Sequence, residues 1–250
     1  MGTIINKTFK DGITIPKEPQ LIVELVGPAG AGKTTLANVL LHRSKRIQPG
    51  IPPNIRKIEN FPFFAKNILL LAPIFLHLYQ NNNGRRLTRQ EITWMLTLNG
   101  WQDMLGRQVT GNGTVVILDQ GPVFMLAKLY GFGPENLKSQ ALKKWWKKIY
   151  LQWADTLDMV VCLDTSDAIL LQRIRAREVW HGFKNLSESE AIEILARFRE
   201  AHNEVLSGLM VGERGPNVLC FDTAKKSQDE IVENLLIQLS IADYEEKIVG

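Results

Sequence analysis

The sequence is poor in cysteine, in metal-ligand patterns and in long apolar runs. Its two cysteines, Cys162 and Cys220, each lie in an apolar run typical of a buried strand, so we expect reduced thiols in preference to a disulfide. The four histidines show no metal-ligand spacing, and there is no Cys-x-x-Cys. The longest apolar stretch, residues 68–79, contains Pro73 and His77 and is shorter than a membrane span requires.

Extremes of composition are also absent. Hydrophobic residues make up 45% and charged residues 22% of the 250 residues, as in an ordinary soluble protein. The net charge of +4 suits a small anionic ligand but is too low for a nucleic-acid interface unless it is clustered. The first residues lack the apolar core of a signal peptide. We therefore expect a cytoplasmic protein with a small-molecule substrate, and neither a membrane nor a nucleic acid as partner.

Short apolar runs alternate with helical patterns, which predicts an α/β fold with a parallel sheet covered on both faces. Strands are expected at residues 21–26, 55–59, 114–118, 158–163 and 217–221. Helices are expected at 34–42, 63–80, 88–109, 134–154, 168–177, from 187 onward and at 227–239. We expect one domain over residues 1–250, with residues 1–20 as a polar lead-in and ligands beyond the carboxyl ends of the strands.

A glycine-rich motif follows the first predicted strand. Residues 27–34, Gly-Pro-Ala-Gly-Ala-Gly-Lys-Thr, fit the P-loop pattern G-x-x-x-x-G-K-[ST] at every constrained position. The glycines let backbone N–H groups turn toward phosphate oxygens, and the following helix directs its positive end at the same anion. The residues expected to bind nucleotide are Gly27, Pro28, Ala29, Gly30, Ala31, Gly32, Lys33, Thr34 and Thr35.

Two side chains of this motif have distinct expected roles. Lys33 is expected to neutralise charge on the β and γ phosphates, and the Thr34 hydroxyl to be a ligand of Mg²⁺. The motif therefore predicts ATP and Mg²⁺ as cofactors.

Four blocks of the sequence resemble the thymidylate kinase and deoxynucleoside kinase family. They are the P-loop, the strand that ends in Asp119, the segment 158–177 with its three arginines, and residues 218–225 with the helix beyond. The resemblance implies a P-loop NTPase fold with a five-stranded sheet of order 2-3-1-4-5 and a lid over about residues 173–187. It also implies ATP-dependent phosphotransfer to a nucleoside or a nucleoside monophosphate.

The resemblance also assigns catalytic residues, in addition to Lys33. Asp119 occupies the acidic position that handles Mg²⁺ or the substrate. Arg173 and Arg177 match the lid arginines; they are four residues apart on one helical face, whereas Arg175 points elsewhere, and we expect them to act on the transferring phosphoryl group. Glu59 ends the predicted second strand, where deoxynucleoside kinases keep a glutamate that accepts the hydroxyl proton, although the proline that follows it in the family is missing.

The acceptor side departs from the family. Gln120 stands where the family has an arginine after the acidic residue, and an amide carries no charge. We therefore expect a neutral acceptor, with Asp119 or Glu59 receiving the proton. If the acceptor were a monophosphate, another arginine such as Arg85, Arg86 or Arg107 would have to take this role.

The sequence leaves several functions open. The leading hypothesis is an ATP-dependent kinase for a nucleoside-like or other hydroxyl acceptor. The alternatives are a nucleoside monophosphate kinase, an NTPase that drives a partner, and a relative that binds nucleotide without catalysis. The predicted helices at 63–80 and 88–109 are apolar enough to include a homodimer face.

Overall fold

A five-stranded parallel sheet forms the centre of the molecule in this computed structural model, which describes residues 7–8, 14–15, 20–81, 84–108, 113–176, 182–211 and 214–240. The order of the strands across the sheet is β4-β5-β3-β6-β7. The strands are β3 (Leu21–Val26), β4 (Ile47–Pro49), β5 (Val115–Asp119), β6 (Met159–Asp164) and β7 (Asn217–Asp222). Counted along the chain, this is the order 2-3-1-4-5, so the expected fold class is confirmed. Two short strands in the lead-in, β1 (Lys7–Thr8) and β2 (Thr14–Ile15), pair antiparallel.

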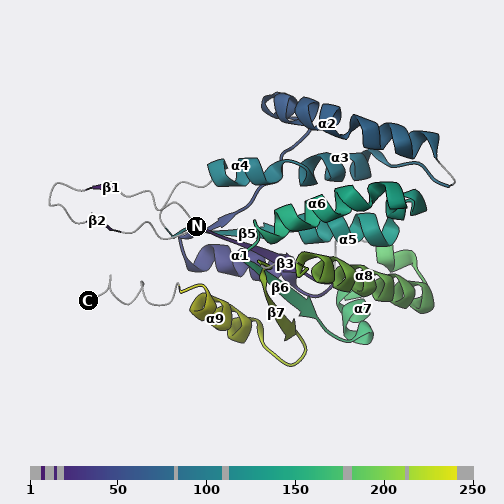
Figure 1. Cartoon of the computed structure of the whole chain (residues 1–250). Coiled ribbons are helices and arrows are strands. Elements are labelled where there is room, and N and C mark those ends of the chain that lie inside the picture. The colour runs from purple at the N-terminus through teal and green to yellow at the C-terminus, as the bar shows by residue number, and fades with distance from the viewer. Residues whose placement is uncertain are drawn as a thin grey trace.

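Helices cover both faces of this sheet (Figure 1). On one face lie α1 (Lys33–Arg43), α7 (Asp167–Ala176) and α9 (Gln228–Gln238); on the other lie α5 (Pro122–Phe132) and α6 (Lys143–Ala154). The long helix α8 (Glu188–Leu209) contributes to both hydrophobic clusters, and it begins where predicted, with a capping box formed by Ser187 and Glu190. Alternate residues of the central strand face opposite layers: Ile22 belongs to one cluster and Val23 to the other. Burial on both faces explains why β3 is apolar almost throughout.

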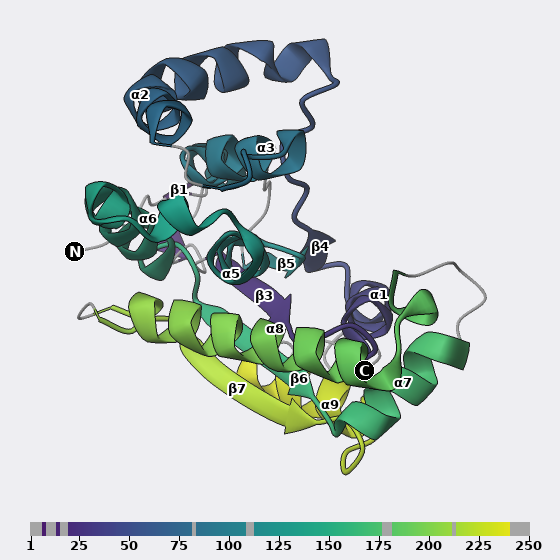
Figure 2. The same ribbon diagram turned by 90° about the vertical axis from the view of Figure 1, so that its right-hand side faces the viewer.

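A further layer lies outside α5 and α6. It consists of α2 (Phe61–Gln80), α3 (Arg89–Leu98) and α4 (Trp101–Gln108), with α2 outermost in Figure 2. Helix α2 buries Phe64, Leu71 and Leu78 against the domain. Within the described residues, the stretch Ile58–Gln80 is long and apolar enough to cross a membrane by length and composition. This helix is longer than the apolar stretch seen in the sequence.

The predicted second strand is wrong. Residues 55–57 form a turn and Ile58–Asn60 a short 3₁₀ helix, and the Ile58 side chain is 92% exposed. The strand is instead Ile47–Pro49, which pairs with β5 at the sheet edge, where proline is tolerated. A side chain at Gly50 would have its Cβ 2.1 Å from a Leu118 methyl, so the glycine permits this close approach.

Two predicted helices also differ from the structure. The expected helix 88–109 breaks at Asn99 and Gly100, where a Cβ on Gly100 would lie 2.8 Å from the Asn67 amide. The expected helix 134–154 begins as two 3₁₀ turns, Glu135–Lys138 and Gln140–Leu142, before α6 starts. A last 3₁₀ turn, Gly182–Asn185, precedes α8.

Candidate phosphate-binding site

The glycine-rich loop joins the end of β3 to the start of α1. Gly27 and Gly30 have φ angles of 139° and 85°, a region that side chains disfavour. A Cβ on Gly27 would lie 2.0 Å from the Leu163 carbonyl oxygen, so no larger residue fits there. Helix α1 begins at Lys33 after Gly32, without a side-chain cap, so its first N–H groups face the loop. The loop thus has the geometry of an anion-binding turn.

Lys33 and Thr34 lie at the start of α1, and the polar groups of both side chains form hydrogen bonds. The Lys33 ammonium donates to the carbonyl oxygens of Gly27 and Pro28, at 2.8 and 2.9 Å. The Thr34 hydroxyl donates to Asp119 Oδ2 at 2.8 Å. This contact joins two residues that are 85 positions apart in the sequence, because β5 is the neighbour of β3 in the sheet.

Asp119 accepts the Thr34 hydrogen bond with one of its two carboxylate oxygens, Oδ2. Its Oδ1 is buried and has no hydrogen-bond partner in the described part of the chain. A carboxylate oxygen and a threonine hydroxyl side by side are ligands that suit Mg²⁺. The predicted metal residues Thr34 and Asp119 therefore lie together beside the loop.

A cavity of about 210 Å³ opens beside the loop. The helices α5 and α8 form its other walls, and the sequence analysis singled out neither. Its lining residues are Gly27, Ala29, Gly30, Gly32, Lys33, Thr34, Gln120, Phe124, Lys128, Phe183, Ile194, Leu195 and Phe198. We call this the loop cavity. Gln120, which has a φ angle of 62°, is one of the residues that line this cavity.

Glu24 is a buried carboxyl group that sequence reasoning missed. It is fully buried in β3, and its two carboxylate oxygens accept from the N–H groups of Val123 and Phe124, at 2.8 and 3.0 Å, at the start of α5. Burial raises the pKa of Glu24 to about 8, although these N–H groups act in the opposite direction. The available signal was a lone acidic residue inside the apolar run Leu21–Val26.

Arg173 contacts the loop that follows β7. Its guanidinium donates to the hydroxyl and the carbonyl oxygen of Thr223, at 2.8 and 3.0 Å. Both residues line a second cavity of about 360 Å³, together with Thr35 and part of the glycine-rich loop. Arg175 is exposed, in agreement with its predicted separation from Arg173. Arg177 lies outside the described residues.

Glu59 does not join this site. It is exposed, forms an ion pair with Lys57 at 3.4 Å, and lines a separate cavity with Pro49 and Met104. Because the second strand is Ile47–Pro49, the strand-end position that the resemblance fills with glutamate and proline is occupied by Gln48 and Pro49. The placement of Glu59 at a strand end was therefore wrong, and the signal that could have found the correct strand end was the Gln-Pro pair.

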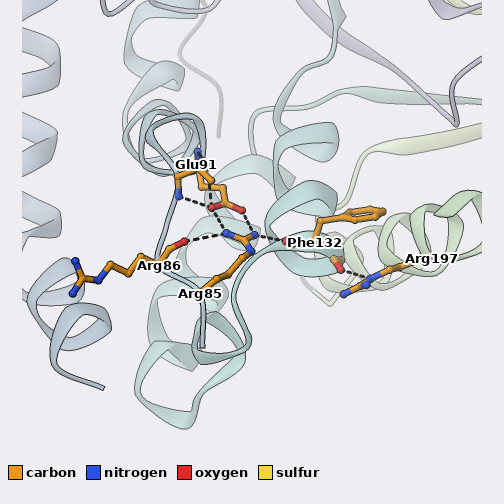
Figure 3. Close-up of polar contacts among 7 residues, drawn as sticks. Arg85, Arg86, Glu91, Phe132 and Arg197 are labelled. Carbon is orange, nitrogen blue, oxygen red and sulfur yellow. Dashed lines mark hydrogen bonds and ion pairs between the residues drawn. The ribbon is translucent and has the colours of Figure 1, made fainter. Parts of the chain in front are cut away.

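Two of the arginines considered as replacements at the acceptor side are engaged elsewhere (Figure 3). Arg85 forms a two-pronged ion pair with Glu91 and also donates to the Phe132 carbonyl oxygen, at the end of α5 that is remote from the loop. The Arg86 guanidinium lies over the ring of Tyr79, 5.1 Å from its centre. The side chain of Arg107 lies outside the described residues.

Behind the glycine-rich loop lies a third cavity of about 440 Å³. Arg199 of α8 forms ion pairs there with Asp164 and Asp167, at 2.7 and 2.6 Å. His202, one turn further along α8, is buried, and its Nε2 has no hydrogen-bond partner among the described residues. Cys162 and Cys220 face each other on β6 and β7 and are free thiols, as expected.

No protein-family model matches the chain, and no curated protein sequence matches it. Solved structures do match. A thymidylate kinase from Candida albicans is 17% identical over 90% of this chain and 92% of that chain, with a TM-score of 0.51. A deoxyadenosine kinase from M. mycoides with bound dATP is 14% identical over 88% of this chain and 100% of that chain, with a TM-score of 0.48. The likeness to the Candida enzyme and the strand order show that the chain has a thymidylate-kinase-like P-loop fold.

Proposed function

We propose that this protein is an ATP-dependent kinase that transfers the terminal phosphoryl group of ATP to a hydroxyl group of a small, nucleoside-like acceptor. The observation that carries the proposal is the 2.8 Å contact between Thr34 and Asp119 beside a glycine-rich loop at the start of α1. Such a site binds triphosphates through backbone N–H groups, a helix N-terminus and a lysine. That the matching fold belongs to a thymidylate kinase supports phosphotransfer over simple hydrolysis.

Thr34 and Asp119 are the residues that would hold Mg²⁺. The unpartnered Oδ1 of Asp119 supports this assignment, since a metal ion would satisfy it. Bound Mg²⁺ supplies positive charge to the phosphate oxygens during transfer. Lys33 would exchange its two carbonyl partners for phosphate oxygens, which are stronger acceptors for an ammonium group.

The acceptor hydroxyl would lose its proton to Asp119. Of the two carboxylates predicted for this step, Asp119 touches the loop and Glu59 lines another cavity. A loose phosphoryl-transfer transition state needs placement and charge neutralisation more than a strong base. Gln120, which lines the loop cavity, is uncharged, and this supports a neutral acceptor. A lid over about residues 173–187 that carries Arg177, and a cytoplasmic location, are further parts of this proposal.

The test is ADP release measured with a panel of nucleosides, nucleoside monophosphates and small alcohols. We expect a neutral hydroxyl acceptor to stimulate ADP release, and Lys33→Ala to abolish it without changing thermal unfolding. Lys45→Ala is the matched control, because Lys45 is an exposed lysine just beyond the same helix. ADP release that does not depend on an acceptor would indicate an NTPase, and tight ATP binding without turnover a non-catalytic relative. Near-wild-type turnover of Lys33→Ala would contradict the site itself.

A further inference from the structure

Lys128 is a cation in the loop cavity that no motif predicted. It lies in the middle of α5 and lines the cavity together with Lys33 and Gln120. Its ammonium lies over three aromatic rings, those of Phe124, Phe132 and Phe198, at 5.9, 4.6 and 4.8 Å from their centres. The rings hold the amine at the wall of the cavity.

This ammonium has no anionic partner within the described part of the chain. No carboxylate there forms an ion pair with Lys128, and burial lowers its pKa. Aromatic faces offset a part of the cost of removing an ammonium from water, whereas a phosphate anion would offset more of it. The charge of Lys128 is therefore best matched by an anionic ligand in the cavity.

The two lysines of the cavity lie close enough to act on one imidazole. Burial first, and then the positive charges of Lys33 and Lys128, lower the pKa of His202 to about 3. Two ammonium groups repel each other unless an anion lies between them. A phosphate held by the glycine-rich loop would be that anion.

Two of the other cations considered for the acceptor side do not compete for this position. Arg85 is neutralised by Glu91 near the end of α5 that is remote from the loop (Figure 3). The Arg86 guanidinium lies over the ring of Tyr79. Gln120 contributes no charge. In the described residues, Lys128 is the cation that lines the loop cavity in addition to Lys33.

We infer that Lys128 binds the terminal phosphate of the nucleotide together with Lys33, and so supplies the positive charge that is missing at Gln120. The inference rests on the proposed function. A terminal phosphate could belong to ATP or to a monophosphate acceptor; we assign it to ATP, because six residues of the glycine-rich motif line the loop cavity and Lys33 is one of them. A neutral acceptor remains compatible with this assignment.

The experiment compares ATP and ADP binding by isothermal titration calorimetry in the presence of Mg²⁺. Lys128→Met keeps an unbranched side chain among the rings and removes the charge. We expect it to bind ATP at least about tenfold more weakly, the loss typical of one charge-assisted hydrogen bond, and to bind ADP as the wild type does. Lys128→Arg keeps the charge and should restore most of the ATP affinity. Lys138→Met is the matched control, since Lys138 lies over the Tyr130 ring but does not line the loop cavity.

A second measurement uses the wild-type protein and does not depend on the folding of a variant. Bound ATP should protect the Lys128 amine from acetylation, read by mass spectrometry, whereas ADP should not, and labelling of Lys138 should not change. Unchanged ATP affinity in Lys128→Met would overturn the inference while leaving the kinase proposal intact. A rise only in the KM of a monophosphate acceptor would overturn the assignment to ATP. A wild-type protein that binds no ATP would overturn both proposals.

Discussion

Glu24 carries a carboxyl group inside a parallel sheet, where a charge is costly. Burial raises the pKa of Glu24 to about 8, well above that of an exposed glutamate. The folded protein therefore favours the protonated form more than the unfolded chain does. The resulting stability is fully present below the ordinary glutamate pKa and is lost as the pH rises toward about 8.

This predicts a pH-dependent stability difference between the wild type and Glu24→Gln. The variant cannot ionise, so its free energy of unfolding should rise relative to that of the wild type as the pH rises. The expected change is up to about 1.4 kcal/mol for each pH unit between the two pKa values. Urea unfolding at several pH values from 5 to 9 measures this difference in the free energy of unfolding. Glu59→Gln, at a side chain that is 69% exposed, is the control and should show no such trend. A constant difference for Glu24→Gln across the range would contradict the raised pKa.

At the same scale, residues within a local motif or on a correctly predicted strand were predictable, whereas residues on elements that were missed were not. The P-loop motif fixes the positions of Lys33 and Thr34 relative to the glycines, because loop and helix are contiguous in the sequence. The nearness of Asp119 to Thr34 followed from the expected strand order. Glu59 was misplaced because it was assigned to a strand end that lies ten residues earlier, at Pro49. Lys128 was missed because only the packing of α5 against the loop brings it to the cavity.

Helix α7 and strand β7 are joined by Arg173 and Thr223, which affects the function expected for this arginine. The sequence predicted a lid residue that acts on the transferring phosphoryl group. In the structure, its guanidinium orders the loop after β7 through two hydrogen bonds. Because the same cavity contains part of the glycine-rich loop, this contact should support nucleotide binding as a whole.

We therefore expect Arg173→Ala to weaken ATP and ADP binding together, by roughly threefold to tenfold, the loss that corresponds to one typical net hydrogen bond. Titration calorimetry with each nucleotide provides the measurement. Arg175→Ala is the matched control on the same helix, because Arg175 is exposed. If Arg173→Ala lowered kcat and left both affinities unchanged, the role predicted from the sequence would be the correct one.

Elements with one apolar face were easier to predict than elements that are buried all round. Helix α9 was predicted almost to the residue, since its capping box and its apolar spacing are both clear. Helix α5 was missed: most of its residues are buried, so it lacks a polar face, and glycines flank and interrupt it. Strand β4 was missed because three residues that end in proline do not resemble a strand.

At the scale of the whole molecule, the exposed side of α2, with the turn before it, carries large apolar side chains that no other described part of the chain covers. Large apolar side chains at Ile58, Phe61, Leu69, Leu76 and Tyr79 are each more than half exposed and recur at the spacing of one helical face. Contiguous exposed apolar side chains of this kind mark interaction surfaces. The opposite side of α2 packs on the domain, which favours docking of another protein over insertion of this helix into a bilayer.

We propose that a second copy of the chain covers this face, as the apolar content of the sequence suggested. A two-fold axis places the same patch on both partners, so one apolar helix face is complementary to itself. Five large apolar side chains, each more than half exposed, lie on this face, and such side chains form the core of stable interfaces. Light scattering after gel filtration should give a dimer for the wild type and a monomer for Leu69→Glu, which puts a charge at the centre of the face. Leu70→Glu is the matched control, since Leu70 is similarly exposed but lies about 100° around the helix, and it should remain dimeric. A monomeric wild type that floats with phospholipid vesicles would contradict the proposal and identify a membrane as the occupant.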